Sequence, residues 1–223
     1  MTRSLGMGAY DSRRQRSLAT RGATRGSPPS LYLLAKRLFD LGGSAVLLVV
    51  LAIAAVILLL LNPWLNRGRL FFVQERMGRH GQPFRAWKLR TMVATDTIER
   101  GAFDPLDSHR ITPLGHLLRR TRLDELPQVI NVIRGEMSLI GPRPDYYPHA
   151  LVYADTVPGY RDRYRVKPGI SGYAQTEVGY VDGLEGVRAK VAADLHYLRH
   201  AGFRLDLWIV WRTLAVVFAR QGA

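Results

Sequence analysis

The chain has 223 residues, enough for one domain with a hydrophobic core and one accessory segment. Its 47% apolar content argues against a disordered chain, and its lack of cysteine excludes disulfides, thiolate zinc sites and cysteine nucleophiles. The net charge of +14 indicates polyanionic partners, which are nucleic acid, anionic lipid headgroups or phosphorylated substrates. Charge alone does not distinguish these three.

Two N-terminal segments precede the bulk of the chain. Residues 1–30 are rich in Arg, Ser, Gly and Thr, with Asp11 as the only acid, so we predict a disordered basic arm that lies on anionic lipid. Residues 31–66 predict a membrane-inserted helix. Within them Ala45 to Leu61 is unbroken apolar sequence, and about 20 helical residues are enough to cross a bilayer core.

The charges beside that helix predict its path. Basic residues mark the cytoplasmic side of a membrane, and here they flank both ends of the apolar run. They are Lys36 and Arg37 before it, and Arg67, Arg69, Arg76 and Arg79 after it. A straight span would put one of these clusters on the wrong side. We therefore expect a re-entrant helix, with a straight signal anchor as the alternative.

Residues 67–223 predict a compact cytoplasmic domain of the α+β class, mainly helical. We expect strands over 70–73 and 84–92, with a turn between them at 77–83, and a polar loop over 93–109. The expected helices cover 116–122, 123–133, 184–198 and 205–220. Residues 145–182 are expected to be mostly irregular. The last helix carries Trp208 and Trp211, which favour the headgroup level of a membrane. It is either an interfacial amphipathic helix or a core helix that closes the domain.

The stretch from Arg119 to Gln128 carries the candidate chemistry. Asp124 precedes a helical apolar period, so we expect it at or near the N-cap, with Glu125 beside it. Pro127 is tolerated there because first-turn amides have no intrahelical acceptor. Taken alone, an Asp-Glu pair in this position is usually a helix cap, so its surroundings decide its meaning.

Those surroundings are basic. Lys88 and Arg90 are two residues apart, so on a strand they point to the same face. Arg143 lies between rigid neighbours in Gly141-Pro142-Arg143-Pro144, and arginine suits bidentate phosphate recognition. Further arginines near the carboxylates in sequence are Arg110, Arg119 and Arg120. A carboxylate pair among arginines is typical of metal-assisted phosphoryl transfer, with one carboxylate as nucleophile and the other helping to hold Mg²⁺.

Several short stretches, in one order along the chain, carry a family resemblance. They are Lys36-Arg37-Leu38-Phe39-Asp40, Phe72 to Gly78, Lys88 to Met92, Asp107 with Arg110-Ile111-Thr112, Leu123 to Gln128, Met137 to Pro144, Lys167 to Gly172, and Asp194 with Tyr197. With them the chain resembles the monotopic phosphoglycosyl transferases, which are bacterial polyprenyl-phosphate sugar-1-phosphate transferases, in their minimal form. One such match is weak, whereas this many in one order is specific.

The resemblance implies a mechanism at the cytoplasmic face of the bacterial inner membrane. Asp124 matches the family nucleophile, which attacks the sugar-linked phosphate of a UDP-sugar donor, releases UMP and passes the phosphosugar to polyprenyl (undecaprenyl) phosphate. Glu125 matches the acidic partner associated with Mg²⁺. The expected substrate-binding residues are Lys36, Arg37, Lys88, Arg90, Arg110, Arg119 and Arg143.

The chain departs from the family pattern in its membrane helix and in one loop. Many members have a proline break midway in the helix, which is the usual cause of a sharp kink, but residues 50–55 hold no proline. The nearest break, Asn62-Pro63, comes near the end of the apolar run. Ser171 stands where Thr is commoner in the family, and this exchange keeps the hydroxyl.

Two other functions stay open on the residues alone. A membrane-tethered nucleic-acid binder would gather its basic residues on one element among exposed aromatics, but here they recur beside carboxylates and rigid turns, so we expect no nucleic-acid partner. A non-catalytic scaffold for glycan enzymes would not need Asp124 and Glu125. His196 and His200 have a metal-ligand spacing but lack the zincin Glu, so we expect no metal there. The sugar, the glycan pathway and a homo-oligomeric state are all left open.

Overall fold

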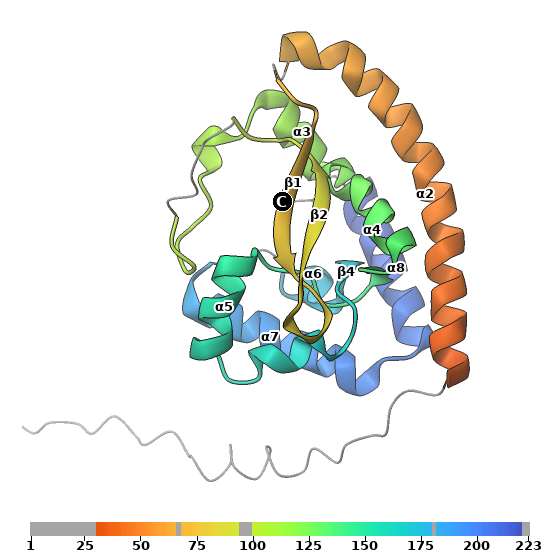
Figure 1. Cartoon of the computed structure of the whole chain (residues 1–223), viewed down its shortest axis with the longest axis vertical. Helices are drawn as coiled ribbons and strands as arrows, with labels where there is room; N and C mark the ends of the chain where they lie inside the picture. The colour runs from red at the N-terminus through yellow and green to blue at the C-terminus, as the bar shows by residue number, and fades with distance from the viewer. Residues whose placement is uncertain (1–29, 66–67, 94–99, 180–181, 220–223) are drawn as a thin grey trace, which may run out of the picture.

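The structure is a computed structural model that describes residues 30–65, 68–93, 100–179 and 182–219. The predicted basic arm lies outside these residues apart from Ser30, which begins the first helix. Helices dominate, and the strands of the described residues form two small sheets, so the predicted mainly helical α+β class is confirmed (Figure 1).

The membrane helix is a single long element. Helix α2 (Ser30–Leu65) is 36 residues long and is apolar enough over Ser30–Asn62 to cross a membrane by length and composition. It is continuous through residues 50–55 and Asn62, and it curves alongside the rest of the chain (Figure 1). Whether it follows a re-entrant or a straight path in a bilayer stays a prediction.

One stripe of α2 faces the remaining domain along most of the helix. The buried members of this stripe are Asp40, Ser44, Leu51, Leu58 and Asn62, at spacings that keep them on one side of an α-helix. The Asp40 carboxylate accepts hydrogen bonds from the Ser138 hydroxyl (3.0 Å) and the Leu139 amide (2.9 Å). Other faces of α2 are apolar and exposed, through residues such as Val46, Val49, Ile53, Val56 and Leu60.

A β-hairpin follows α2. Strands β1 (Phe71–Met77) and β2 (Pro83–Leu89) are antiparallel and joined through the short 3₁₀ helix η1 (Arg79–Gly81). The predicted strand 70–73 was too short, because pairing with β2 continues to Met77. The predicted strand 84–92 was too long, because β2 ends at Leu89.

The Asp-Glu stretch lies in a tight turn between two short helices. These are α3 (Pro113–Arg120), whose first turn is capped by the Thr112 hydroxyl accepting from the Gly115 amide at 3.0 Å, and α4 (Val129–Arg134). Between them η3 (Leu123–Gln128) is a 3₁₀ helix, so the single helix expected over 123–133 is corrected to two types of helix. Asp124 lies inside η3, and the N-cap position belongs to Arg122.

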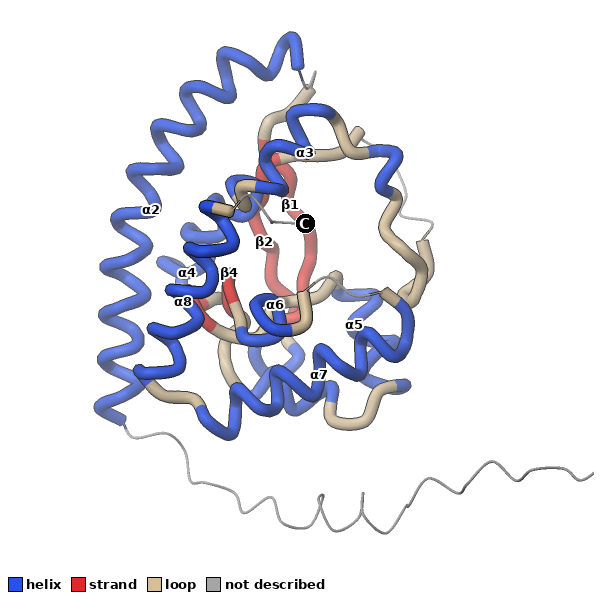
Figure 2. Tube along the Cα trace, turned by 180° about the vertical axis from the view of Figure 1, so that it is seen from behind, coloured by secondary structure: helices blue, strands red, loops and turns tan. Residues whose placement is uncertain are grey.

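The C-terminal half wraps helices around a second small sheet. Strands β3 (Ser138–Ile140) and β4 (Gly169–Ser171) pair in parallel, and the helices are α5 (Tyr147–Thr156), η4 (Tyr160–Arg165), α6 (Tyr173–Glu177), α7 (Gly183–His200) and α8 (Phe203–Phe218) (Figure 2). The expectation that 145–182 is mostly irregular was therefore wrong. Its prolines and glycines separate short elements, and α5 has no N-terminal side-chain cap.

Helix α8 closes the domain with one of its sides, and its place at a membrane surface stays a prediction. Ile209 is fully buried in a core shared with Phe84, Val132 and Tyr197, so one side of α8 closes the domain. Its other side exposes an apolar stripe, Phe203, Leu207, Trp211, Leu214 and Phe218. A helix that is buried on one side and apolar on its exposed side has the pattern of an interfacial helix.

Candidate active site

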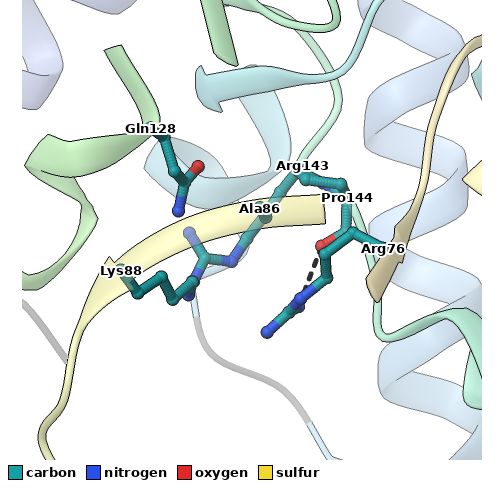
Figure 3. Close-up of a pocket in the computed structure, with 6 residues that line it drawn as sticks. All are labelled: Arg76, Ala86, Lys88, Gln128, Arg143 and Pro144. Carbon is teal, nitrogen blue, oxygen red and sulfur yellow. Dashed lines mark hydrogen bonds between the residues drawn. The ribbon is translucent and has the colours of Figure 1, made fainter. Parts of the chain in front are cut away.

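One face of the hairpin forms the floor of a small pocket. Ala86 and Lys88 lie on the same face of β2, and Arg76 lies on that face of β1, because Arg76 pairs with Phe84. Gln128 from η3 and the Arg143-Pro144 segment after β3 complete the wall (Figure 3). The pocket is lined by three cationic side chains, Arg76, Lys88 and Arg143, so its charge suits an anion.

Glu125 is the centre of the charge cluster. Its buried carboxylate accepts from Lys88 Nζ at 3.0 Å, from Arg143 Nη1 at 2.5 Å and also from Arg143 Nη2, while Arg122 Nη1 lies 3.9 Å away. Burial alone raises the pKa of Glu125, but Arg143 and Lys88 outweigh it and hold the pKa well below its usual range. Glu125 therefore stays ionised and fixes two cations beside the pocket.

Asp124 is the neighbouring carboxylate in a different electrostatic state. It is only 9% exposed, and among the described residues none donates a hydrogen bond to it. Burial raises its pKa to about 6, the Glu125 charge adds to this, and Lys88, Arg143 and Arg119 offset it only in part. An ionised carboxylate that is buried without donors is a strong candidate nucleophile.

Lys88 and Arg119 supply positive charge from two sides. Burial lowers the pKa of Lys88 to about 8, against the opposing effect of Glu125. Arg119, at the end of α3, donates from Nε to the Thr91 hydroxyl at 3.0 Å. Thr91 is buried, so this bond holds the Arg119 side chain against the segment that follows β2.

Comparison with known proteins places this site in a family. The model of the bacterial sugar transferases matches residues 31–220. The chain belongs to the bacterial sugar transferase family. The match covers the site residues of the hairpin, of η3 and of the Arg143 segment.

Named relatives share this region. The chain is 33% identical over 199 residues (88% of this chain, 46% of the relative) to the UDP-N-acetylgalactosamine-undecaprenyl-phosphate N-acetylgalactosaminephosphotransferase of Aeromonas hydrophila. It is 38% identical over 185 residues (78% and 40%) to the UDP-glucose:undecaprenyl-phosphate glucose-1-phosphate transferase of Escherichia coli strain K12. It is 36% identical over 196 residues (85% and 72%) to the protein of that same name from Caulobacter vibrioides. The chain thus spans less than half of the first two relatives and most of the third.

Five of the predicted site residues come together in this member of the family. They are Lys88, Arg119, Asp124, Glu125 and Arg143, which come from β2, α3, η3 and the segment after β3. The substrate-binding and metal-binding roles assigned to them stay predictions. The structure shows that the positively charged side chains near the two carboxylates come from three separate parts of the sequence.

Two predicted arginines have contacts with nearby loops. Arg90 lies one residue beyond the end of β2, so it does not share a face of that strand with Lys88 as expected. Its Nε donates to the Arg69 carbonyl at 2.7 Å. Arg110, in the 3₁₀ turn η2 (Ser108–Arg110), donates to the Val93 carbonyl at 2.9 Å and pairs with Asp107 at 3.6 Å.

Lys36 and Arg37 fasten the membrane helix to the domain. Lys36 Nζ pairs with the Asp206 carboxylate at 2.7 Å. Arg37 donates to the Val132 carbonyl at 2.7 Å and to the Ile133 carbonyl at 2.9 Å, which caps the end of α4. These contacts leave both side chains in structural roles, and their binding of substrate stays a prediction.

Four neighbours of the site were not singled out from the sequence. Arg76, Ala86 and Gln128 line the pocket, and Arg122 approaches Glu125. Arg76 and Gln128 lie within quoted family stretches, but only the hairpin register and the turn of η3 reveal where they point. His196 and His200 have ring centroids 4.2 Å apart, yet no three potential metal ligands gather anywhere in the described part of the chain.

Proposed function

We propose that this protein transfers a sugar-1-phosphate from a UDP-sugar to polyprenyl phosphate through a covalent phosphosugar ester on Asp124. The observation that carries the proposal is the contrast between two adjacent buried carboxylates. Glu125 holds Lys88 and Arg143, whereas Asp124 accepts no hydrogen bond from the described residues and has a raised pKa. Membership of the sugar transferase family supports the same reaction class.

In the first step an Asp124 carboxylate oxygen attacks the sugar-linked phosphorus. A new P–O bond forms to the carboxylate, the P–O bond to the bridging oxygen breaks, and UMP leaves with that electron pair. Lys88, Arg119 and Arg143 offset the negative charge of the diphosphate during the attack. Lys88 and Arg143 also line the cationic pocket, which could take the diphosphate.

In the second step a phosphate oxygen of the lipid acceptor attacks the same phosphorus. The bond to Asp124 breaks, the carboxylate is regenerated, and the product is a polyprenyl diphosphate sugar. The aspartyl ester divides one difficult exchange between two phosphate anions into two displacements at the same cationic site. No other reactant is needed for either step.

The carboxylate pair also fits a Mg²⁺ ion that arrives with the donor. Protein Mg²⁺ sites of this kind use one or two carboxylates together with substrate phosphates. Glu125, the expected ligand, already accepts from two cations, so an ion without phosphate would meet their repulsion. When bound, the ion would offset charge on the phosphates. We expect Mg²⁺ to bind weakly to the protein alone and much more tightly when a UDP-sugar is present.

We also propose that α2 keeps the catalytic domain on the cytoplasmic face of the bacterial inner membrane. The domain-facing stripe of α2 runs from Asp40 to Asn62. A straight crossing would separate this stripe from its partners or draw the domain into lipid, which supports a helix that enters and returns on one side. Single cysteines near Trp64 and at the N-terminus, labelled from each side of the membrane, test this topology, and accessibility from opposite sides would refute it.

The decisive experiment traps the adduct. Protein in nanodiscs is incubated with Mg²⁺ and a UDP-sugar labelled with ³²P in the sugar-linked phosphate, without acceptor. We expect release of unlabelled UMP and a protein-bound label that added polyprenyl phosphate removes as labelled lipid. Asp124→Asn should abolish both label and lipid product, whereas the matched change Asp155→Asn, at an exposed ion pair, should not. Retained turnover in Asp124→Asn would refute the nucleophile.

A screen of UDP-sugars that follows UMP release would identify the donor. Hexose and N-acetylhexosamine donors should both be included, because the named relatives act on both kinds. The lipid product would be the first membrane-bound intermediate of a bacterial glycan such as exopolysaccharide, capsule or O-antigen.

A further inference from the structure

The segment that carries Arg143 is held by an unusual number of backbone contacts. Three successive carbonyls each accept a hydrogen bond: Arg143 O from Arg163 Nη2 (3.0 Å), Pro144 O from Arg76 Nη1 (3.0 Å) and Asp145 O from the Met77 amide (3.0 Å). Two of these three donors are arginine side chains. The backbone from which Arg143 projects is therefore fixed by charged groups that come from distant parts of the sequence.

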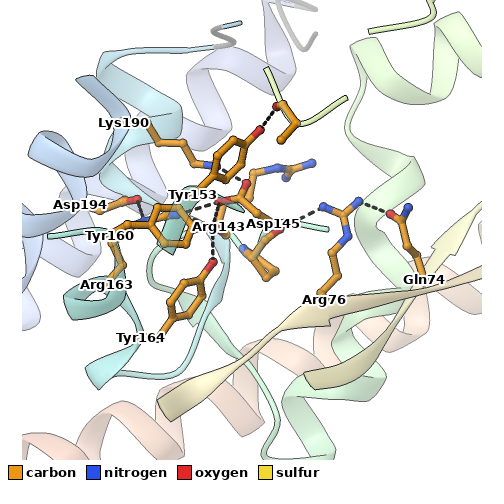
Figure 4. Close-up of polar contacts among 12 residues, drawn as sticks. Gln74, Arg76, Arg143, Asp145, Tyr153, Tyr160, Arg163, Tyr164, Lys190 and Asp194 are labelled. Atoms are coloured by element: carbon orange, nitrogen blue, oxygen red, sulfur yellow. Dashed lines mark hydrogen bonds and ion pairs between the residues drawn. The ribbon is translucent and has the colours of Figure 1, made fainter. Parts of the chain in front are cut away.

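Arg163 is fully buried and is itself held by a network of charges. Its Nε donates to Asp194 at 2.7 Å, and its Nη1 donates to Asp145 at 2.7 Å (Figure 4). Asp145 also accepts from the Tyr160 hydroxyl at 2.8 Å and from Lys190. We call Asp145, Arg163, Lys190 and Asp194 the buried hub. A fixed guanidinium of this kind leaves its donors little freedom to move.

We infer that Arg163, locked by the buried hub, is a positioning residue that sets the geometry of Arg143 at the active site. Arg143 pairs with Glu125 through two guanidinium nitrogens, and a bidentate pair depends on distance and on angle together. The hub acts on that pair through the backbone carbonyl of Arg143 and touches neither carboxylate of the site. This inference rests on the proposed function for its readout.

Position matters here because Arg143 influences the nucleophile directly. The charged groups that face Asp124 are Glu125 on the same turn, Lys88 on β2, Arg119 on α3 and Arg143 after β3. A shift of Arg143 breaks its bidentate pair with Glu125 and moves its positive charge away from the place where the donor phosphate would meet Asp124. A misplacement of about 1 Å can cost on the order of 10²-fold in rate.

The experiment measures the rate of single-turnover UMP release at saturating UDP-sugar and one fixed pH. Four proteins are compared in nanodiscs: wild type, Arg143→Gln, Arg163→Lys and the double variant. We expect Arg163→Lys to slow the step by roughly 10–100-fold, in the direction of Arg143→Gln. The double variant should be no slower than Arg143→Gln alone, because both changes remove the same function.

Two further variants separate positioning from stability. Tyr160→Phe removes one hydrogen bond to Asp145 and keeps every hub charge, so it tests the inference even if Arg163→Lys folds poorly. It should slow UMP release by a smaller factor, and this slowing should be lost when Arg143→Gln is also present. Val187→Ala lies in the same core as Tyr160 but makes no polar contact with the hub. It should lower the melting temperature and leave the rate of UMP release unchanged.

The outcomes separate this inference from the proposed function. Absence of UMP release by the wild type would reject the function itself. If the wild type and Arg143→Gln behave as expected, the inference is overturned by independent, additive losses in the double variant. It is also overturned by unchanged rates of UMP release in both Arg163→Lys and Tyr160→Phe.

Discussion

The two charge clusters of this protein contain the same number of acids and bases but pair them differently. The buried hub contains two acids and two bases, and so does the catalytic cluster of Lys88, Asp124, Glu125 and Arg143. In the hub both acids accept a hydrogen bond from Arg163, although burial still raises the pKa of Asp194. In the catalytic cluster Glu125 takes both cations, and Asp124 is left with no donor among the described residues. The hub therefore pairs each of its acids with a buried cation, whereas the catalytic cluster leaves one carboxylate without a bonded partner, which favours reactivity over stability.

The largest expected effect comes from breaking the hub. Asp145→Asn removes the carboxylate that pairs with Arg163 Nη1 and with Lys190, and leaves the fully buried guanidinium with reduced compensation. Burial raises the pKa of Asp145, but Lys190 and Arg163 outweigh it and hold the pKa well below its usual range, so the ionised form adds stability. Loss of one member of a buried ion pair costs about 3–5 kcal/mol. We expect the free energy of unfolding, measured by denaturant titration in detergent micelles, to fall by about that amount.

An exposed ion pair provides the control for the hub. Asp155 pairs with Arg161, and both side chains are about three-quarters exposed, at 76% and 75%. Asp155→Asn should change the free energy of unfolding by less than about 0.5 kcal/mol. Equal effects of Asp145→Asn and Asp155→Asn would show that the hub contributes no more than a surface pair.

In the catalytic cluster we expect a substitution to raise the free energy of unfolding instead of lowering it. The pKa of Asp124 is raised from 3.8 to about 6, so its ionisation destabilises the folded state, and stability is lost as the pH rises through about 6. Asp124→Asn removes this cost and should raise the free energy of unfolding at pH 8 by about 2–3 kcal/mol. At pH 3, where the carboxyl is protonated in both states, the gain should vanish.

Glu125→Gln tests whether the neighbouring carboxylate changes the free energy of unfolding in the opposite direction. Glu125 has a lowered pKa, so its ionised form adds stability at neutral pH that is lost only in acid. The substitution should therefore destabilise the protein at pH 8, where Asp124→Asn stabilises it. Destabilisation by both changes would mean that Asp124 is compensated in the same way as Glu125.

The sequence predicted the chemistry of the catalytic cluster better than its local structure. The Asp124-Glu125 pair and the arginine between two prolines were recognisable because rare spacings and rigid residues mark them. The hub was not recognisable: Arg163 lies in a stretch that was expected to be irregular, and its partners Asp145 and Asp194 are far from it in sequence. Short 3₁₀ elements such as η3 and η4 give no clear periodicity.

The same limit applies to the membrane helix. Its apolar composition predicted insertion, but the polar contacts that fasten it to the domain depend on tertiary packing. Lys36 and Arg37 look like ligands for anions in sequence, and in the structure they bond to Asp206 and to the end of α4. Two adjacent basic residues in the sequence therefore do not predict which groups they bind or how far they lie from the two carboxylates of the site.

A smaller effect, the pH dependence of turnover, tests the charges of the catalytic cluster. UMP release needs ionised Asp124 and charged Lys88, with pKa values of about 6 and about 8. We expect a bell-shaped profile of the first half-reaction between these limits. Lys88→Met should remove the alkaline limb and move the acidic midpoint upward, because Lys88 lowers the pKa of Asp124. An acidic midpoint that moves downward in this variant would contradict the assignment.

The smallest expected effect tests the pocket without changing any charge. Ala86 is buried on the pocket floor beside Arg76 and Lys88, so Ala86→Val adds volume directly beneath the cationic side chains. If the donor phosphates use this space, the KM for the UDP-sugar should rise about fivefold, equivalent to about 1 kcal/mol, with a smaller change in kcat. Ala150→Val adds the same volume to a core of α5 remote from the carboxylates and should leave KM unchanged. Because both variants overpack a buried alanine, a rise in KM confined to Ala86→Val would assign the effect to the pocket, and equal KM values would place the donor elsewhere.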